Sequence, residues 1–229
     1  MLTECSDRGR APLTQTRGPS QADATETFWK EVKRATDPLH NEVEATWVSK
    51  AMLGTRQPEA WWIPVLRYWW TTYDEHEARL QRLPATLQEA IRVPDSPPHM
   101  ARLTEDLALL GASPLPASLE ARRCTSAETT SELLGRAYVL EGAVLGGAVI
   151  AKRLGLTYGT SYPGRHFYGD SRAALQTWRS RRERLGSWVC SAGDPVLFIR
   201  GACAAFEDIR SGLMQLEPSL RKLAVAETA

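Results

Sequence analysis

The sequence predicts an all-α fold in a single domain. Apolar residues recur with helical periodicity from about Thr27 onward, and there is no β-hairpin signal and no run of alternating strand residues. The periodic segments are separated by connectors rich in proline and glycine. A chain of 229 residues suits one large domain or two small ones and is long enough to bury a sizeable core. No internal repeat divides it, so we expect one set of helices around one core.

The connectors between the periodic segments define the bounds of the expected helices. "RVPDSPPHM" and "GASPLPAS" are Pro-rich connectors, and "GLTYGTSYPGRHFYGD" is a Gly-rich loop of a length that is often functional in a compact helical domain. Gly155 is the expected C-cap of the helix before this loop, and Asp170 or Ser171 the expected N-cap of the next. The helices are Phe28–Lys50, Glu59–Leu83, Pro98–Leu110, Ala127–Leu154, Ser171–Val189 and Pro195–Leu216.

The two ends of the chain differ from the middle. Residues 1–24 are polar, rich in Ser, Thr, Gly and Pro, and lack the apolar region of a secretory signal, so a disordered tail is expected. The helical domain is expected over residues 25–220, with a flexible tail over residues 221–229. The chain contains no run of 18 or more apolar residues, so no transmembrane helix is expected.

Charge and cysteine content narrow the class of protein. The 28 basic and 27 acidic residues nearly cancel, so nothing points to nucleic acid or an anionic membrane as a partner. The four cysteines are far apart, with no C-x-x-C motif and no zinc spacing. We therefore expect a reduced, cytoplasmic protein. The cysteines are Cys5, Cys124, Cys190 and Cys203.

An aromatic stripe marks the second helix. Trp62, Trp69 and Tyr73 are spaced i, i+7 and i+11, and Leu66 lies beside them. This spacing is how a helix buries aromatic residues, so we interpret the stripe as core rather than as a binding surface.

The segment "YVLEGAVLGGAVIAKRL" carries three glycines, Gly142, Gly146 and Gly147, inside an expected helix. Each costs about 1 kcal/mol relative to alanine. Gly135, Gly142 and Gly146 lie within about 20° of one line along the helix. Such a strip of bare backbone allows either close packing of two helices or the close approach of a flat ligand. Geometry alone favours packing. The flanking residues are apolar: Val139, Val149 and Ile150.

A histidine upstream favours the second explanation of the glycines, the close approach of a flat ligand. His40 lies in "KRATDPLHNEVEATW", and Glu44 follows one turn later on the same helix face. A metal-binding histidine is commonly held by a carboxylate on its second ring nitrogen, although such a pair is more often a surface contact. A single histidine ligand together with a bare helix face predicts an iron porphyrin held between two helices.

The segments "RATDPLHNEVEA" and "YVLEGAVLGGAVIAKRLGL" resemble those of the biliverdin-producing heme oxygenases, most closely the bacterial branch associated with bacteriophytochromes. The similarity runs from about Trp29 to Leu216, and "RHFYGD" followed by a helix with Trp178 and "RSR" resembles the family's C-terminal half. The resemblance implies a single-domain heme-oxygenase-like helical bundle with heme sandwiched between a proximal and a distal helix.

The resemblance also implies roles for particular residues. His40 would be the axial ligand of the heme iron, and Glu44 would support it. On the distal helix Gly142 and Gly146 would touch the heme, with Gly147 adding flexibility.

Two basic residues would approach the heme propionates by the same resemblance. They are Lys33 and Arg179, with Arg182 as the substitute for Arg179. The competing interpretation is that Lys33 and Arg179 belong to solvated helix faces.

The implied activity is the oxidative cleavage of heme b, which is both substrate and cofactor, to biliverdin, CO and ferrous iron. It uses O₂ and electrons from a donor such as ferredoxin or a flavin reductase. A bacteriophytochrome is the candidate recipient of the biliverdin.

Two features depart from the family pattern. Many members carry a polar residue just after the first distal glycine, where this chain has Ala143 and Val144. That motivates an alternative, a heme-binding or storage protein without turnover. Pro38 lies two residues before His40, so the ligand helix is expected either to start near Asp37 or to kink at Pro38.

Two further alternatives belong to other classes. A helical dimetal carboxylate protein needs paired Glu-x-x-His motifs, and the nearest match here is Asp37-x-x-His40. A cysteine-dependent hydrolase needs a cysteine with an activating partner, which the sequence does not indicate.

Overall fold

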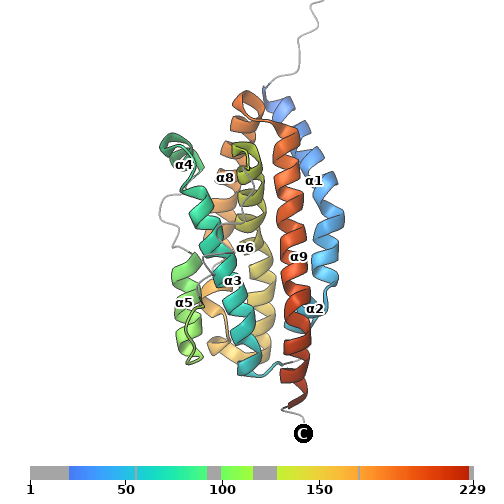
Figure 1. Ribbon diagram of the computed structural model, residues 1–229, viewed down its shortest axis with the longest axis vertical. Coiled ribbons are helices and arrows are strands. Elements are labelled where there is room, and N and C mark those ends of the chain that lie inside the picture. Colours follow the sequence, from blue (N-terminus) through green and yellow to red (C-terminus); the bar gives the residue numbers. More distant parts are fainter. Residues whose placement is uncertain (1–20, 55, 92–98, 116–127, 170, 227–229) are drawn as a thin grey trace, which may run out of the picture.

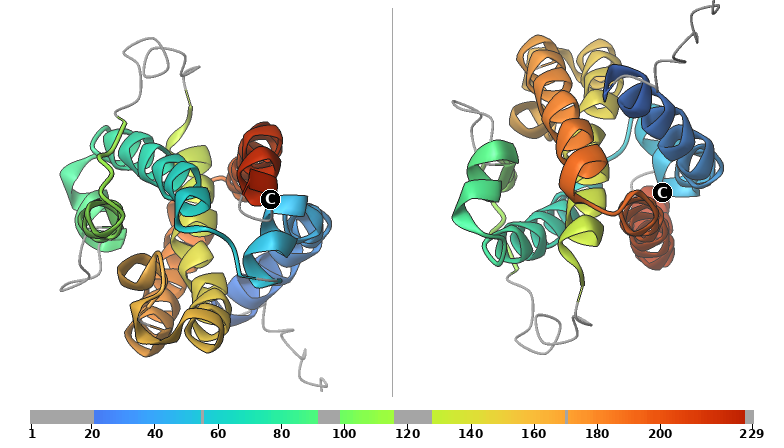
Figure 2. Two further views of the ribbon diagram at one scale, coloured as in Figure 1. Left: turned by 90° about the horizontal axis from the view of Figure 1, so that it is seen from below. Right: turned by 90° about the horizontal axis from the view of Figure 1, so that it is seen from above.

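The computed structural model describes residues 21–54, 56–91, 99–115, 128–169 and 171–226. Every element in these ranges is helical, which confirms the all-α prediction. The long helices run along one axis (Figure 1), and α6 passes through the middle of the bundle, with α1 and α9 on one side and α3 to α5 on the other (Figure 2). The elements are α1 (Gln21–Ala45), α2 (Trp47–Leu53), α3 (Glu59–Leu80), α4 (Ala85–Ile91), α5 (His99–Leu109), α6 (Thr130–Tyr158), the 3₁₀ turn η2 (Gly159–Ser161), α7 (Arg165–Tyr168), α8 (Ser171–Ala192) and α9 (Pro195–Ala226).

The first expected helix is two helices. α1 ends at Ala45, and the side chain of Thr46 accepts a hydrogen bond from the Ser49 backbone N–H at 3.3 Å, which caps the start of α2. α1 also contains Pro38 in its interior, so the first of the two expected arrangements, a ligand helix that begins near Asp37, is wrong. The buried residues Phe28, Trp29 and Val32 anchor α1 well before that proline.

Both ends of the helical region extend further than expected. α1 begins at Gln21, and α9 continues through residues 221–226, where a tail was expected. Leu213 and Leu220 of α9 are buried, so packing against the core holds the last turns in helical form.

The distal helix also runs past its expected end. α6 begins at a capping box formed by Thr129 and Glu132, and it continues through Gly155, which is therefore not its cap. The cap is Gly159, whose φ of 79° suits glycine and whose N–H bonds to the Gly155 carbonyl. The expected Gly-rich loop thus contains the end of α6, η2 and α7. Asp170, the other proposed cap, lies outside the described residues, as do Cys5 and Cys124.

The backbones of α6 and α9 touch where each carries a glycine. A Cβ on Gly135 would lie 2.0 Å from the Phe198 carbonyl oxygen, and one on Gly201 would lie 2.1 Å from the Glu132 carbonyl oxygen. At this level of α6 the helix-packing explanation of the glycines is correct. The aromatic stripe is core as predicted at Trp62, Leu66 and Tyr73, which are fully buried. Trp69 is the exception, because it is partly buried and lines a cavity.

The described part of the chain has one stretch, Thr130–Ser161, that is long and apolar enough to cross a membrane by length and composition. The expectation of no span relied on unbroken apolar runs, whereas this stretch reaches the threshold with glycine and scattered polar residues included. It forms the central helix of the bundle (Figure 2), and core helices commonly meet the same criterion.

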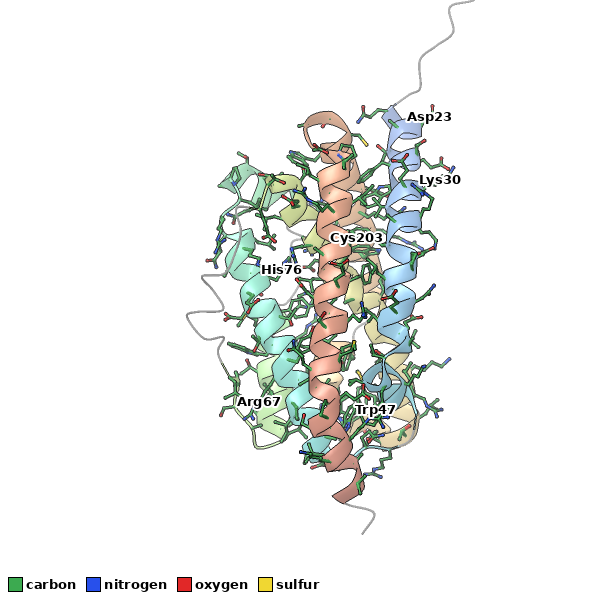
Figure 3. The ribbon with its side chains drawn as sticks, turned by 45° about the vertical axis from the view of Figure 1, so that its right-hand side comes forward. Asp23, Lys30, Trp47, Arg67, His76 and Cys203 are labelled. Atoms are coloured by element: carbon green, nitrogen blue, oxygen red, sulfur yellow. The ribbon has the colours of Figure 1, made fainter. Side chains whose placement is uncertain are left out.

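Of the cysteines in the described ranges, Cys190 and Cys203 are free thiols, and Cys203 lies where α9 faces α1 (Figure 3).

Candidate functional site

A cavity of about 640 Å³ lies between α1 and α2 on one side and α6 on the other. Its volume is within the range of ligand pockets. α7, α8 and α9 close its remaining sides, and most of its lining is apolar. The lining residues include His40, Val43, Glu44, Ser49, Met52, Leu53, Trp69, Tyr138, Val139, Gly142, Ala143, Leu145, Gly146, Val149, Ile150, Phe167, Tyr168, Trp178, Phe206, Ile209 and Leu213.

The proximal wall carries His40 and Glu44. Both side chains are exposed, His40 at 53% and Glu44 at 68%, and Nδ1 of His40 lies 3.8 Å from a carboxylate oxygen of Glu44. This is an ion-pair distance and is too long for a hydrogen bond. The imidazole packs edge-on against Phe206 of α9, with ring centroids 5.6 Å apart. With Nδ1 turned toward Glu44, Nε2 is the ring nitrogen left for a ligand.

The three glycines of the distal helix have three different neighbours. A Cβ on Gly142 would lie 3.0 Å from the indole of Trp178, and one on Gly147 would lie 3.3 Å from the ring of Tyr168. A Cβ on Gly146 would meet nothing within 4 Å. Gly142 and Gly146 line the cavity, and Gly147 is not among its lining residues. The bare backbone that is open to a ligand is therefore at Gly146.

The two basic residues assigned to propionates do not line the cavity. Lys33 is exposed and forms an ion pair with Asp37 one turn later. Arg179 is exposed on α8.

Arg182 is better placed than Arg179. Its guanidinium lies 4.8 Å from the Trp29 ring, and Trp29 stacks at 5.0 Å on Tyr138, which lines the cavity. Burial raises the pKa of the Tyr138 hydroxyl, and the charge of Arg182 partly offsets this rise. Arg182, the substitute, does not line the cavity, but it is linked through Trp29 to the lining residue Tyr138.

The side chains beside the open glycine are apolar. Val139, Ala143, Leu145 and Ile150 line the cavity from α6. The side chain of Val144 lies outside the part of the chain that the structure describes. The sequence has no polar residue directly after Gly142, and in the structure the α6 side chains that line the cavity there are apolar as well.

The structure also reveals a buried polar cluster around Glu141. One carboxylate oxygen lies 3.1 Å from Nε2 of His99, the other lies 3.5 Å from Nε2 of His76, and Arg181 forms an ion pair with the same carboxylate. Burial alone would raise the pKa of Glu141, but contacts from both histidines and from Arg181 hold it well below its usual range.

Sequence reasoning missed this cluster because its members come from four helices, α3, α5, α6 and α8. The one sign of the cluster in the sequence is Glu141, an acidic residue inside an otherwise apolar segment. A buried carboxylate in such a segment needs a partner, but its identity depends on the tertiary fold.

Replacing Glu141 with glutamine is expected to lower the free energy of unfolding by about 3 kcal/mol at pH 7, because the buried ion pair of Glu141 with Arg181 is broken. The folded-state pKa of Glu141 is depressed, so its stabilisation is present above the unfolded pKa of about 4.3 and is lost as the pH falls further. The gap between wild type and Glu141→Gln should thus shrink between pH 7 and pH 3. Urea unfolding at both pH values measures it, and an equal gap would contradict this role for the carboxylate.

Within the described ranges, no group of three or more His, Cys, Asp or Glu side chains is arranged to hold a metal ion. The dimetal alternative therefore gains no support from these residues.

Comparison with known proteins agrees with the cavity geometry. A sequence model of the family described as "Heme oxygenase" matches residues 26–211. No curated protein sequence gives a significant match. Similar solved structures include heme oxygenase-2 from Synechocystis sp. PCC 6803 in complex with heme and NO, at 18% identity and a TM-score of 0.71, covering 85% of this chain and 87% of that one.

Two further structures show the same fold. Heme oxygenase-1 from the same cyanobacterium, in complex with heme, is 16% identical with a TM-score of 0.71, covering 88% of this chain and 97% of that one. The NO- and CO-bound heme oxygenase from Neisseria meningitidis is 22% identical with a TM-score of 0.63, covering 82% and 90%.

Proposed function

The chain belongs to the heme oxygenase family, and we propose that it binds heme b in the cavity between α1 and α6 and cleaves it to biliverdin, CO and ferrous iron. The observation that carries this proposal is the pairing of His40 on one wall with the open backbone of Gly146 on the other. Structures of similar proteins that contain heme support it.

The residues present fit a flat iron porphyrin. His40 offers a nitrogen ligand of the type that holds heme iron, and the opposite wall lacks a side chain at Gly146, where any Cβ would reduce the space. The lining between them is apolar, as the faces of a porphyrin require. We assign Arg182, whose charge acts on the lining residue Tyr138, to one propionate. Lys33 is paired with Asp37 outside the lining, so it receives no such role.

When bound, heme supplies the iron that activates O₂ and the ring that is oxidised, with electrons from an external donor such as ferredoxin or a flavin reductase. The protein's part is to hold, orient and shield. His40 would hold the iron, the carboxylate of Glu44 lies near enough to interact electrostatically with the imidazole without hydrogen-bonding to it, and the apolar α6 wall would shield the ring. We also propose that the chain belongs to the bacteriophytochrome-associated branch, on the strength of "YVLEG" and "LGG".

The test is a hemin titration followed by a single turnover. We expect a Soret band that saturates at one hemin per chain, and, after ascorbate and O₂ are added, replacement of that band by the broad red absorption of biliverdin. Failure to form a saturable Soret band would refute the proposal.

The second candidate function is heme binding or storage without turnover. The apolar wall at Ala143 favours it, because no side chain there can hold a water that delivers protons. In the same experiment a storage protein would bind hemin and form no biliverdin.

Replacing Glu44 with glutamine is expected to weaken hemin binding and turnover by about tenfold or less. Carboxylates that hold a metal-binding histidine are usually worth about 10- to 100-fold. The effect is at the low end here because the carboxylate is exposed and 3.8 Å from the ring. Hemin titration of both proteins measures it, and a loss as large as that of His40→Ala would show that Glu44 does more than steady the ring.

A further inference from the structure

Arg153 of the distal helix is hydrogen-bonded to the end of α2. Arg153 of α6 donates hydrogen bonds from Nε to the Leu53 carbonyl at 2.9 Å and from Nη2 to the Gly54 carbonyl at 3.3 Å. The last carbonyls of a helix lack partners within the helix, and the negative end of the helix dipole favours a cation there. The guanidinium of Arg153 therefore supplies both the donors and the positive charge that the end of α2 favours. The contact joins two helices that lie far apart in the sequence.

These two helices form opposite walls of the cavity. α2 contributes Ser49, Met52 and Leu53 to the lining, and α6 contributes its open backbone and the side chains after it. Leu53 is 40% exposed and Val149 is 63% exposed although both line the cavity, so they mark its rim. Arg153 follows Val149 by one helical turn and therefore links the two walls at that rim.

The other end of α2 is held by different means. Trp47 lies at the start of α2, toward the lower end of the bundle beside α9 (Figure 3), and the guanidinium of Arg221 lies 4.4 Å from its ring. The start of α2 is thus fixed to α9, and its end is held to α6 through the Arg153 side chain. A break of the Arg153 contacts would loosen the end of α2 at the cavity rim, while two hydrogen bonds between the Tyr158 hydroxyl and the Gln57 backbone still hold the following segment to α6.

We propose that Arg153 is a positioning residue that fastens the α2 wall to α6 and slows the escape of a tetrapyrrole from the cavity. The inference rests on the proposed function, because it requires heme or its product to occupy the space between these walls. The Arg153 contacts are solvent-exposed, so they are weak enough to break during each release.

The test compares Arg153→Gln with Lys152→Gln. Both remove one positive charge from neighbouring positions of α6, but Lys152 is exposed and does not line the cavity. Hemin-loaded protein is mixed with excess apomyoglobin, and the rate of hemin transfer gives the dissociation rate. We expect Arg153→Gln to release hemin about tenfold faster, the change produced by a loss of about 1.4 kcal/mol. We expect Lys152→Gln to match wild type.

Two additional measurements separate fastening from a general structural effect. The Soret position of Arg153→Gln should equal that of wild type, since the iron ligand is untouched. Arg153→Lys should recover part of the slow release, because it keeps a long, positively charged side chain that can donate to the carbonyls at the end of α2. Equal release rates for Arg153→Gln and Lys152→Gln would overturn the proposal, as would faster release accompanied by a shifted Soret band. A wild-type chain that binds no hemin would refute the proposed function itself, whereas normal binding with equal release rates would refute only the role of Arg153.

Discussion

Replacing His40 with alanine is expected to abolish heme cleavage and to shift the heme spectrum. His40 is the one histidine among the lining residues, so its loss leaves the iron without a protein nitrogen ligand from this wall. The cavity that remains is apolar and can still hold the porphyrin, so residual hemin binding with an altered Soret band is expected. Added imidazole should fill the vacated space and restore part of the turnover.

His166→Ala is the matched control for this variant. His166 also lies close to a carboxylate, with Nδ1 at 3.2 Å from Glu105, but it is outside the cavity lining. Its replacement should leave the spectrum and turnover unchanged. Normal binding and cleavage of heme by His40→Ala would show that the axial assignment is wrong.

Replacing Gly146 with alanine is expected to stabilise the ligand-free protein and weaken its hold on heme. A new Cβ at this position meets nothing within 4 Å, and alanine in a helix interior is worth about 1 kcal/mol over glycine. The same methyl group occupies space that a porphyrin face would use. We expect hemin affinity to fall about tenfold, equivalent to 1.4 kcal/mol. Urea unfolding of the ligand-free protein and hemin titration measure the two effects.

The paired variant is Gly135→Ala, on the same line of α6. Its Cβ would lie 2.0 Å from the Phe198 carbonyl, so α6 and α9 must separate, and a loss of about 3 kcal/mol in the free energy of unfolding is expected. The two glycines should therefore respond with opposite signs. A loss of stability in both variants would mean that Gly146 also serves helix packing, and unchanged hemin affinity in Gly146→Ala would mean that no ligand reaches that backbone.

The sequence predicts the helices better than their ends. Periodicity located each long helix because buried residues such as Trp62 and Tyr73 recur at helical spacing. The ends depend on contacts that periodicity does not carry. The break before α2 requires the Thr46 cap, and α6 passes Gly155 to end at Gly159, where the backbone turns left-handed.

The candidate site was predictable in part, for a similar reason. His40, Glu44, Gly142 and Gly146 line one cavity. Spacing within each helix made them candidates, and the family resemblance gave them their roles. Which helix faces which is set by the tertiary fold. For this reason the sequence favours Arg179 over Arg182, although in the structure it is the charge of Arg182 that acts on the lining residue Tyr138.

Long-range polar contacts were the least predictable feature. The partners of Glu141 lie on three other helices, and the Arg153 contacts join residues about 100 positions apart. No local pattern specifies either set. Both depend on how α6 is surrounded.

Product analysis of the wild-type chain tests the central claim most directly. Purified protein loaded with one equivalent of hemin is supplied with O₂ and a reductant in the presence of catalase, CO is trapped with deoxymyoglobin, and the pigment is extracted and identified by mass. We expect one biliverdin and one CO for each heme consumed. Intact heme recovered at the end of the reaction, with neither biliverdin nor CO, would contradict the enzymatic account and leave a heme-binding protein of the same fold.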